Sequence, residues 1–117
     1  MDALEIIGRV LFSLIFLASG LGHFKAADAM AGYAKSKGIP AAKLSVLGSG
    51  VLMLIGAVLV ILGNNIGGLL LAIFLVPTAV LMHPFWKETD AMAKMSEQTN
   101  FLKDLALAGA ALILYIM

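Results

Sequence analysis

The sequence predicts an all-α membrane protein, a four-transmembrane-helix bundle with short interfacial helices in two long connections. Hydrophobic residues make up 62% of the 117 residues and charged residues 13%, against about 25% charged in an ordinary soluble domain. Positions 44–86 contain no Asp, Glu, Lys or Arg. A chain of this size cannot bury so much apolar surface in a water-soluble core, so we expect the solvent to be lipid.

Composition also excludes several classes of protein. The net charge is only +1 and there is no basic stretch, which argues against a nucleic-acid-binding protein. The chain has no cysteine, and this excludes a disulfide framework, a thiolate nucleophile, cysteine-ligated zinc and an iron–sulfur cluster. A membrane thiol–disulfide oxidoreductase is excluded for the same chemical reason.

The four spans are placed by the length of apolar helix that crosses a bilayer, about 20 residues. The uncharged stretch is long enough for two crossings, and the turn signal Gly63-Asn64-Asn65 divides it. Pro84 ends the third span, because proline lacks an N–H and disfavours helical geometry in the residue before it. The expected helices of this single membrane domain (residues 1–117) are 4–24, 44–63, 66–83 and 101–117.

The first span is expected to be a retained helix and not a signal peptide, because Asp2 and Glu5 make its start acidic. Four spans place both termini on one side of the membrane and both long connections on the other. The connections carry most of the positive charge, in Lys25, Lys35, Lys37, Lys43, Lys87 and Lys94. The other side offers only Arg9, so the positive-inside rule predicts that both termini lie outside.

Each long connection is expected to contain a short helix that rests on the headgroup layer. Asp28 is predicted to cap a helix that runs to Lys37, with Gly38 as its left-handed stop. Asp90 is predicted to cap a second helix that runs to Gln98. Solvated loops with some helical content are the alternative for both connections.

One face of the first span carries its polar side chains. The residues on this face are spaced by three or four positions, and they are Glu5, Arg9, Ser13, Phe16, Gly20 and His23. Arg9 and Glu5 have the favourable spacing for an intrahelical ion pair. Because a charge in lipid is unfavourable, two interpretations of Arg9 are open. Either it reaches the outer headgroups, screened by Glu5, or it is a buried anchor for a polar ligand or a carboxylate of a neighbouring subunit.

The topology brings polar and aromatic residues together at the cytoplasmic membrane face, where the first and third spans end and the fourth begins. The candidate ligand-binding residues there are His23, His83, Trp86, Asn100, Lys103 and Asp104, and Arg9 is added from the opposite side. An aromatic-lined cleft with a few convergent polar groups is the default ligand site. A quinone head group is flat and has two carbonyl acceptors, so it suits His or Lys donors and stacking on an aromatic ring.

Other interpretations of these residues stay open. Bis-histidine haem ligation needs both imidazoles to face one iron, which does not suit two histidines at helix ends. Zinc would need His23, His83 and Asp104, whose spacing matches no metal motif, so no metal is assigned. In the simplest alternative, both histidines are amphipathic interface residues, and Asn100 and Lys103 belong to a polar helix start.

Short motifs occur in a fixed order along the chain. They are Gly8-Arg9-Val10-Leu11-Phe12, Ser19-Gly20, Phe24-Lys25, Lys37-Gly38-Ile39-Pro40, Gly63, His83-Pro84-Phe85-Trp86 and Asn100-Phe101-Leu102-Lys103-Asp104 through Ala108-Gly109. In order and spacing, this set resembles the DoxX family of small bacterial and archaeal four-helix membrane proteins. The family often has a glutamate in its second helix, near residues 52–54 here. This chain has none, and it carries Asp104 where asparagine is common.

The resemblance implies a multi-pass protein of the plasma (inner) membrane that is a subunit or accessory protein of a quinone-linked redox pathway. It also implies a partner redox protein, and a site at the positions of Arg9, His83, Trp86, Asn100 and Lys103. The chain itself is not expected to be a complete oxidoreductase, because it offers no redox-active side chain beyond Trp and Tyr. The alternatives are a non-catalytic scaffold, in which small-residue helix faces also allow a homo-oligomer, and a small-molecule transporter.

Overall fold

The computed structural model describes all 117 residues and contains helices only. Its elements are α1 (Ala3–Lys25), α2 (Ala27–Ser36), α3 (Ala42–Ile61), α4 (Ile66–Met82), the 3₁₀ turn η1 (Phe85–Lys87) and α5 (Ala91–Ile116). Four of these segments are long and apolar enough to cross a membrane: α1, α3, α4 together with η1, and α5. The four predicted spans are therefore confirmed.

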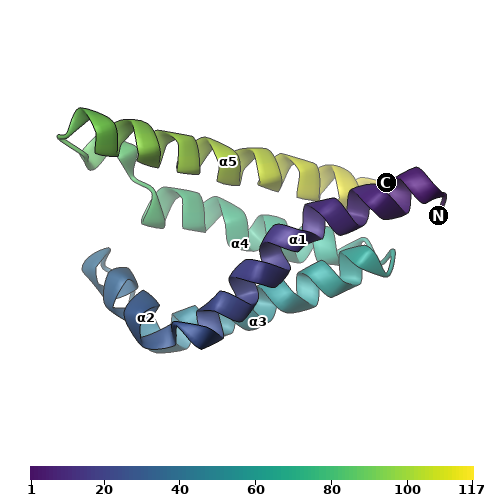
Figure 1. Ribbon diagram of the computed structural model, residues 1–117, viewed down its shortest axis with the longest axis horizontal. Helices are drawn as coiled ribbons and strands as arrows, with labels where there is room; N and C mark the ends of the chain where they lie inside the picture. Colours follow the sequence, from purple (N-terminus) through teal and green to yellow (C-terminus); the bar gives the residue numbers. More distant parts are fainter.

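The two chain termini lie at the same end of the molecule, at the right of Figure 1. We call this the terminal end; it comprises the start of α1, the turn between α3 and α4, and the last turns of α5. The two long connections, residues 26–41 and 83–90, lie at the opposite end with the helix turns that flank them, and we call this the connection end (Figure 1). This arrangement fits an even number of crossings, while the orientation across the membrane stays a prediction.

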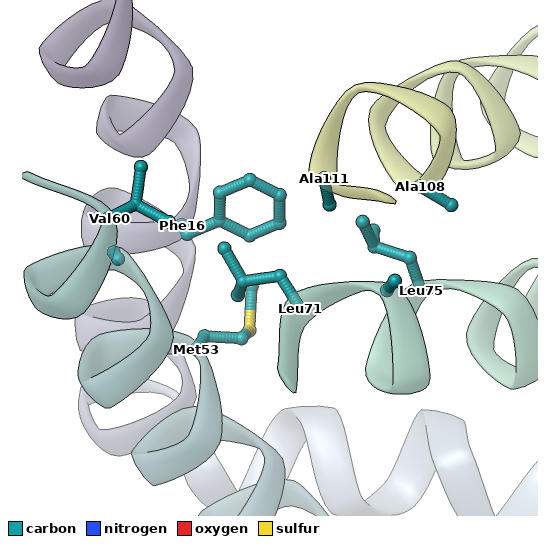
Figure 2. Packing of buried hydrophobic residues seen from close by; sticks show 9 residues of the cluster. Phe16, Met53, Val60, Leu71, Leu75, Ala108 and Ala111 are labelled. Atoms are coloured by element: carbon teal, nitrogen blue, oxygen red, sulfur yellow. The ribbon is translucent and has the colours of Figure 1, made fainter. Parts of the chain in front are cut away.

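The long helices pack in a chain of neighbours, α1 against α3, α3 against α4 and α4 against α5. Nine buried residues form the core between them, which Figure 2 shows: Phe16, Met53, Ala57, Val60, Leu71, Ala72, Leu75, Ala108 and Ala111. Phe16 is the one buried residue of α1 in this core, and its ring lies between the side chains of α3 and α4 and faces α5 (Figure 2).

Glycines let the helix backbones approach each other closely. A Cβ atom on Gly67 of α4 would lie 2.5 Å from the carbonyl oxygen of Gly56 in α3. A Cβ on Gly68 would overlap the backbone of Ala111 in α5. On α1, a Cβ on Gly20 would lie 2.8 Å from Leu54 of α3. Small residues at such crossings are the usual means of packing helices in lipid, where van der Waals contact replaces the hydrophobic effect.

Most of the apolar surface stays on the outside. Only 20 of the 117 residues are buried, and the exposed residues include Leu4 and Leu11 on α1 and Leu44 and Ile73 on α3 and α4. Such a surface is unfavourable in water and suits acyl chains, which satisfy apolar side chains. The protein is a multi-pass membrane protein.

The turns follow the predicted signals. Gly63 has a φ of +85°, which glycine adopts without steric strain, and it reverses the chain between α3 and α4. Gly38 has a φ of +82° after α2, as predicted. Helix α4 ends at Met82, just before the predicted boundary at His83 and Pro84.

The connections differ from the prediction in two respects. Asp28 does not cap α2, which begins one residue earlier at Ala27 and has no side-chain cap. Asp90 does cap a helix, because its carboxylate accepts a hydrogen bond of 2.9 Å from the backbone N–H of Ala93. That helix does not end at Gln98 but continues as α5 to Ile116, since no glycine or proline interrupts residues 91–108. The predicted separate helix and fourth span are thus one helix.

Candidate ligand-binding site

A cavity of about 790 Å³ lies between the pair α1 and α3 and the pair α4 and α5, toward the connection end. Its wall contains residues of all five α-helices, and most of them are hydrophobic. The two helix pairs diverge toward α2 in Figure 1, which leaves room for this cavity. Ile15, Ile73 and Leu81 line the cavity and also belong to the exposed surface of the molecule.

His23 lies in the last turn of α1 and lines the cavity. Its Nδ1 atom is 2.8 Å from the carbonyl oxygen of Val46 in α3 and 3.1 Å from the hydroxyl of Ser49. Because a carbonyl oxygen can only accept, Nδ1 carries the proton and donates it, and Nε2 of the neutral ring is then an acceptor. Gly50 makes room for this contact, since a Cβ there would lie 2.8 Å from Cβ of His23.

His83 follows α4 and lies between two carboxylates of α5. Its Nδ1 atom is 3.2 Å from Oε2 of Glu97, and its Nε2 atom is 3.6 Å from Oδ2 of Asp104. The first contact has hydrogen-bonding length, whereas the second is too long for a hydrogen bond. Oδ2 of Asp104 is buried and has no hydrogen-bond partner. A buried polar atom without a hydrogen bond is unfavourable by about 1–3 kcal/mol. Asp104 lines the cavity, but this oxygen itself is covered by protein.

Glu97 is the member of this cluster that the sequence analysis did not select. Its Oε1 accepts a hydrogen bond of 3.2 Å from Nδ2 of Asn100, while its Oε2 faces His83. Glu97 and Asp104 are seven residues apart, so they share one face of a continuous helix. The prediction of a helix break after Gln98 hid this register, and reading residues 91–116 as one helix reveals it.

Three of the predicted site residues line the cavity, namely His23, His83 and Asp104. Asn100 does not line it; it donates to Glu97, which also lies outside the wall and contacts the lining residue His83. Lys103 is exposed and lies outside the wall.

Trp86 also lies outside the cavity wall, in an aromatic cluster on the surface. Its ring packs edge to face against Phe85 at 5.2 Å and against Phe101 at 5.7 Å between centroids. The aromatic residues that do line the cavity are Phe16, Tyr33 and Phe74. An aromatic lining is therefore present, but rings other than Trp86 form it: Phe16 and Phe74 in the bundle and the half-exposed Tyr33 of α2.

Arg9 lies near the terminal end, away from the cavity wall. Its side chain is only 5% exposed, which rules out the interpretation that it reaches the outer headgroups. The guanidinium donates to the carbonyl oxygen of Val60 at 3.0 Å and to Oδ1 of Asn65 at 3.2 Å, and it lies 3.7 Å from the carboxylate of Glu5. Arg9 thus ties α1 to the turn between α3 and α4 and serves as a buried anchor within the chain itself.

Comparison with known protein families agrees with this architecture. The family model described as DoxX matches residues 4–84, which is more than half of the chain. The chain belongs to the DoxX family. The match covers α1 to α4, so the resemblance of residues 100–109 to the closing helix of DoxX proteins lies outside it. No curated protein sequence and no solved structure matches this DoxX chain.

Proposed function

We propose that this DoxX protein is a membrane subunit or accessory protein of a quinone-linked redox pathway and holds a quinone or a lipid-like molecule in its cavity. The observation that carries the proposal is the pairing of a mostly apolar cavity with one polar cluster at its wall, His83 and Asp104. By the positive-inside rule, this polar cluster is on the cytoplasmic side.

The cavity has the size and chemistry that such a ligand needs. Its volume lies within the range of about 300–1,000 Å³ that is typical of small-molecule pockets. Apolar side chains suit an acyl or isoprenoid tail. The flat ring of a quinone would stack against Phe74 or Tyr33, and its polar substituents would face the histidines.

Electron transfer would require a second protein. The chain has no cysteine and offers only tryptophan and tyrosine as redox-active side chains, so a partner must supply or accept the electrons. The long helix α5 packs against α4 and η1 and leaves most of its surface open, which suits such a partner. The same open surface favours the second candidate function, a non-catalytic scaffold for another membrane protein.

The chain offers a matched pair of glycines for testing the cavity. Gly22 of α1 lines the cavity, and a Cβ there would meet no atom within 4 Å, so a phenylalanine would enter free space. Gly8 on the same helix is equally unobstructed but does not line the cavity. The variants G22F and G8F therefore place the same side chain on the same helix inside and outside the proposed site.

The measurement is binding of decylubiquinone to the purified protein in nanodiscs, with retention of the ligand in native mass spectrometry as a second readout. We expect G22F to weaken binding about tenfold or more through overlap with the ligand, and G8F to bind like the wild type. Equal binding by G22F and the wild type would show that the cavity is not the site. Co-purification of a stoichiometric protein partner without any bound small molecule would favour the scaffold.

A further inference from the structure

The wall of the cavity changes from polar to apolar with depth. Its polar side chains at the connection end include His23, Ser45, Ser49 and His83. The part farthest from the connection end, which we call the inner end, has only apolar side chains, those of Ile15, Phe16, Met53, Ile73 and Leu75. A molecule that fits both parts has a polar head group toward the connection end and an apolar tail toward the inner end.

The depth of the cavity is close to that of one leaflet of a bilayer. On α1 its lining residues run from His23 to Ile15, which spans about 12 Å of helix at 1.5 Å per residue. On α4 they run from Met82 to Ile73, or about 14 Å. Half of the hydrocarbon core of a bilayer is about 15 Å thick. The inner end therefore lies near the middle of the membrane.

Buried core residues close the cavity in the direction of the terminal end. Phe16, Met53 and Leu75 are each at most 5% exposed, and they belong to the core between the long helices (Figure 2). Such a core is closely packed and leaves no channel for a chain of carbon atoms. A tail that reaches the inner end cannot continue straight through the molecule.

The cavity is open on one side, between α1 and α4. These two helices each pack against α3 and have no extensive contact with each other. At the inner end, Ile15 of α1 and Ile73 of α4 line the cavity and are also 43% and 58% exposed. The surrounding acyl chains therefore meet the cavity at the depth where its core side is closed.

We infer that the cavity binds long-tailed amphiphiles in one orientation, with the head group toward the connection end and the tail leaving sideways between Ile15 and Ile73. This inference rests on the proposed function, because it assumes that the cavity holds a lipophilic molecule. An extended carbon chain advances about 1.2 Å per bond, so the wall encloses about the first ten carbons of the tail. Later carbons lie in lipid, which is as apolar as the wall, and add little to the affinity. The site therefore selects the head group and the first part of the tail, but not the total tail length.

Two kinds of tail have the required chemistry, a straight alkyl or acyl chain and a branched isoprenoid chain. Both are flexible and apolar, and both exceed the depth of the cavity in common membrane amphiphiles. The inference concerns the path of the tail, and the experiment distinguishes the two kinds.

The first test maps the path of the tail by photolabelling of the full-length protein in nanodiscs. Three ubiquinone analogues share an octadecyl tail and carry a diazirine at its second, tenth or last carbon. Labelled residues are identified by mass spectrometry of peptides. We expect the second-carbon probe to label the wall near His23 and Tyr33, the tenth-carbon probe to label Ile15, Met53 or Ile73, and the last-carbon probe to label mainly lipid.

The second test measures tail length, by displacement of the tenth-carbon probe at equal ratios of ligand to lipid. We expect decyl and octadecyl ubiquinones to compete within about twofold of each other, because the extra carbons stay in lipid. A tetraprenyl ubiquinone competes in parallel, and the stronger of the octadecyl and tetraprenyl competitors identifies the kind of tail. I73W places a large side chain in the opening and should weaken octadecyl binding about tenfold relative to decyl binding. V76W is the control, because Val76 is exposed on the same helix but lies outside the wall.

The outcomes separate this inference from the proposed function. A reversed order of labels along the wall would overturn the orientation. Octadecyl binding at least tenfold weaker than decyl binding in the wild type, an unchanged ratio in I73W, or labelling of Met53 by the last-carbon probe would each overturn the sideways exit. In all these cases G22F still removes the labelling, and the cavity stays the site. If no probe gives labelling that G22F removes, the proposed function itself fails.

Discussion

The two ends of this molecule use their buried polar groups differently, although each leaves one buried side-chain atom without a hydrogen bond, Nε of Arg9 and Oδ2 of Asp104. At the terminal end, the Arg9 guanidinium is almost completely buried and donates to Val60 and Asn65, and Asn65 in turn donates to the carbonyl oxygen of Met117 at 2.6 Å. At the connection end, Asp104 keeps an unpartnered oxygen beside a cavity. The hydrogen bonds of Arg9 and Asn65 hold helices together, whereas His83 and Asp104 lie at the wall of a cavity.

Helix packing explains why the two ends differ. Near the terminal end, Gly56 and Gly67 bring α3 and α4 together, and Gly68 brings α4 against Ala111. Toward the connection end, the chain leaves the helices through long connections, and the two helix pairs diverge (Figure 1). Changes at the terminal end should therefore alter stability, while changes at the connection end should alter binding. Three variants test this contrast.

The largest effect on stability is expected for G68L. A side chain at this position would overlap the backbone of α5 at Ala111, and backbone cannot move aside as a flexible side chain does. We expect the free energy of unfolding to fall by about 3 kcal/mol, at the upper end for overpacked sites. Thermal unfolding in detergent measures this, with G109L as control, because a Cβ on Gly109 meets nothing within 4 Å. Equal melting temperatures for the two variants would contradict the close α4–α5 contact.

A smaller loss is expected for R9M, which keeps the apolar stem and removes the guanidinium. The carbonyl of Val60 then loses its charged donor, and Asn65 loses one of its two partners. We expect the free energy of unfolding to fall by about 2 kcal/mol. This is less than the sum of two hydrogen bonds to a charged group, because the variant also removes a buried charge. K94M, which removes an exposed cation, is the control. If R9M is as stable as the wild type, the unfavourable free energy of burying the charge equals the favourable free energy of its hydrogen bonds.

The smallest change in stability is expected for H83A, about 1 kcal/mol or less, because His83 and both of its carboxylate partners are partly exposed. Its effect should appear in ligand binding, with affinity for decylubiquinone reduced about tenfold through loss of a wall contact. K103A is the control, since Lys103 lies on α5 next to Asp104 but outside the cavity wall. Weaker binding by K103A than by H83A would place the head group at the surface instead.

The spans could be predicted from sequence because each depends on local properties. A run without charges sets the spans of α3 and α4, Gly63 and Pro84 set their ends, and Asp90 sets the start of α5. The inward face of α1 was also predictable, because Arg9 and its neighbours three and four positions on share one side of a helix.

The site was predicted only in part, because it depends on how helices pack. The sequence places Trp86, Lys103 and Asp104 at one membrane level, but not on which side of a helix the cavity lies. Asp104 faces it and Lys103, one residue away, does not. Glu97 was hidden by a predicted helix break that the uninterrupted sequence of α5 does not produce. The pairing of Arg9 with Asn65 joins residues 56 positions apart, and no local pattern encodes it.

Ile15, Ile73 and Leu81 belong both to the wall of the cavity and to the outer surface, so the cavity opens sideways toward the acyl chains. The lipophilic molecule proposed for this cavity would reach it by diffusing in the plane of the bilayer, without first dissolving in water. The concentration that determines its binding is then its mole fraction in the membrane, because apolar molecules partition strongly into lipid. If the proposed function holds, occupancy of the cavity follows the lipid composition of the membrane more closely than any aqueous concentration.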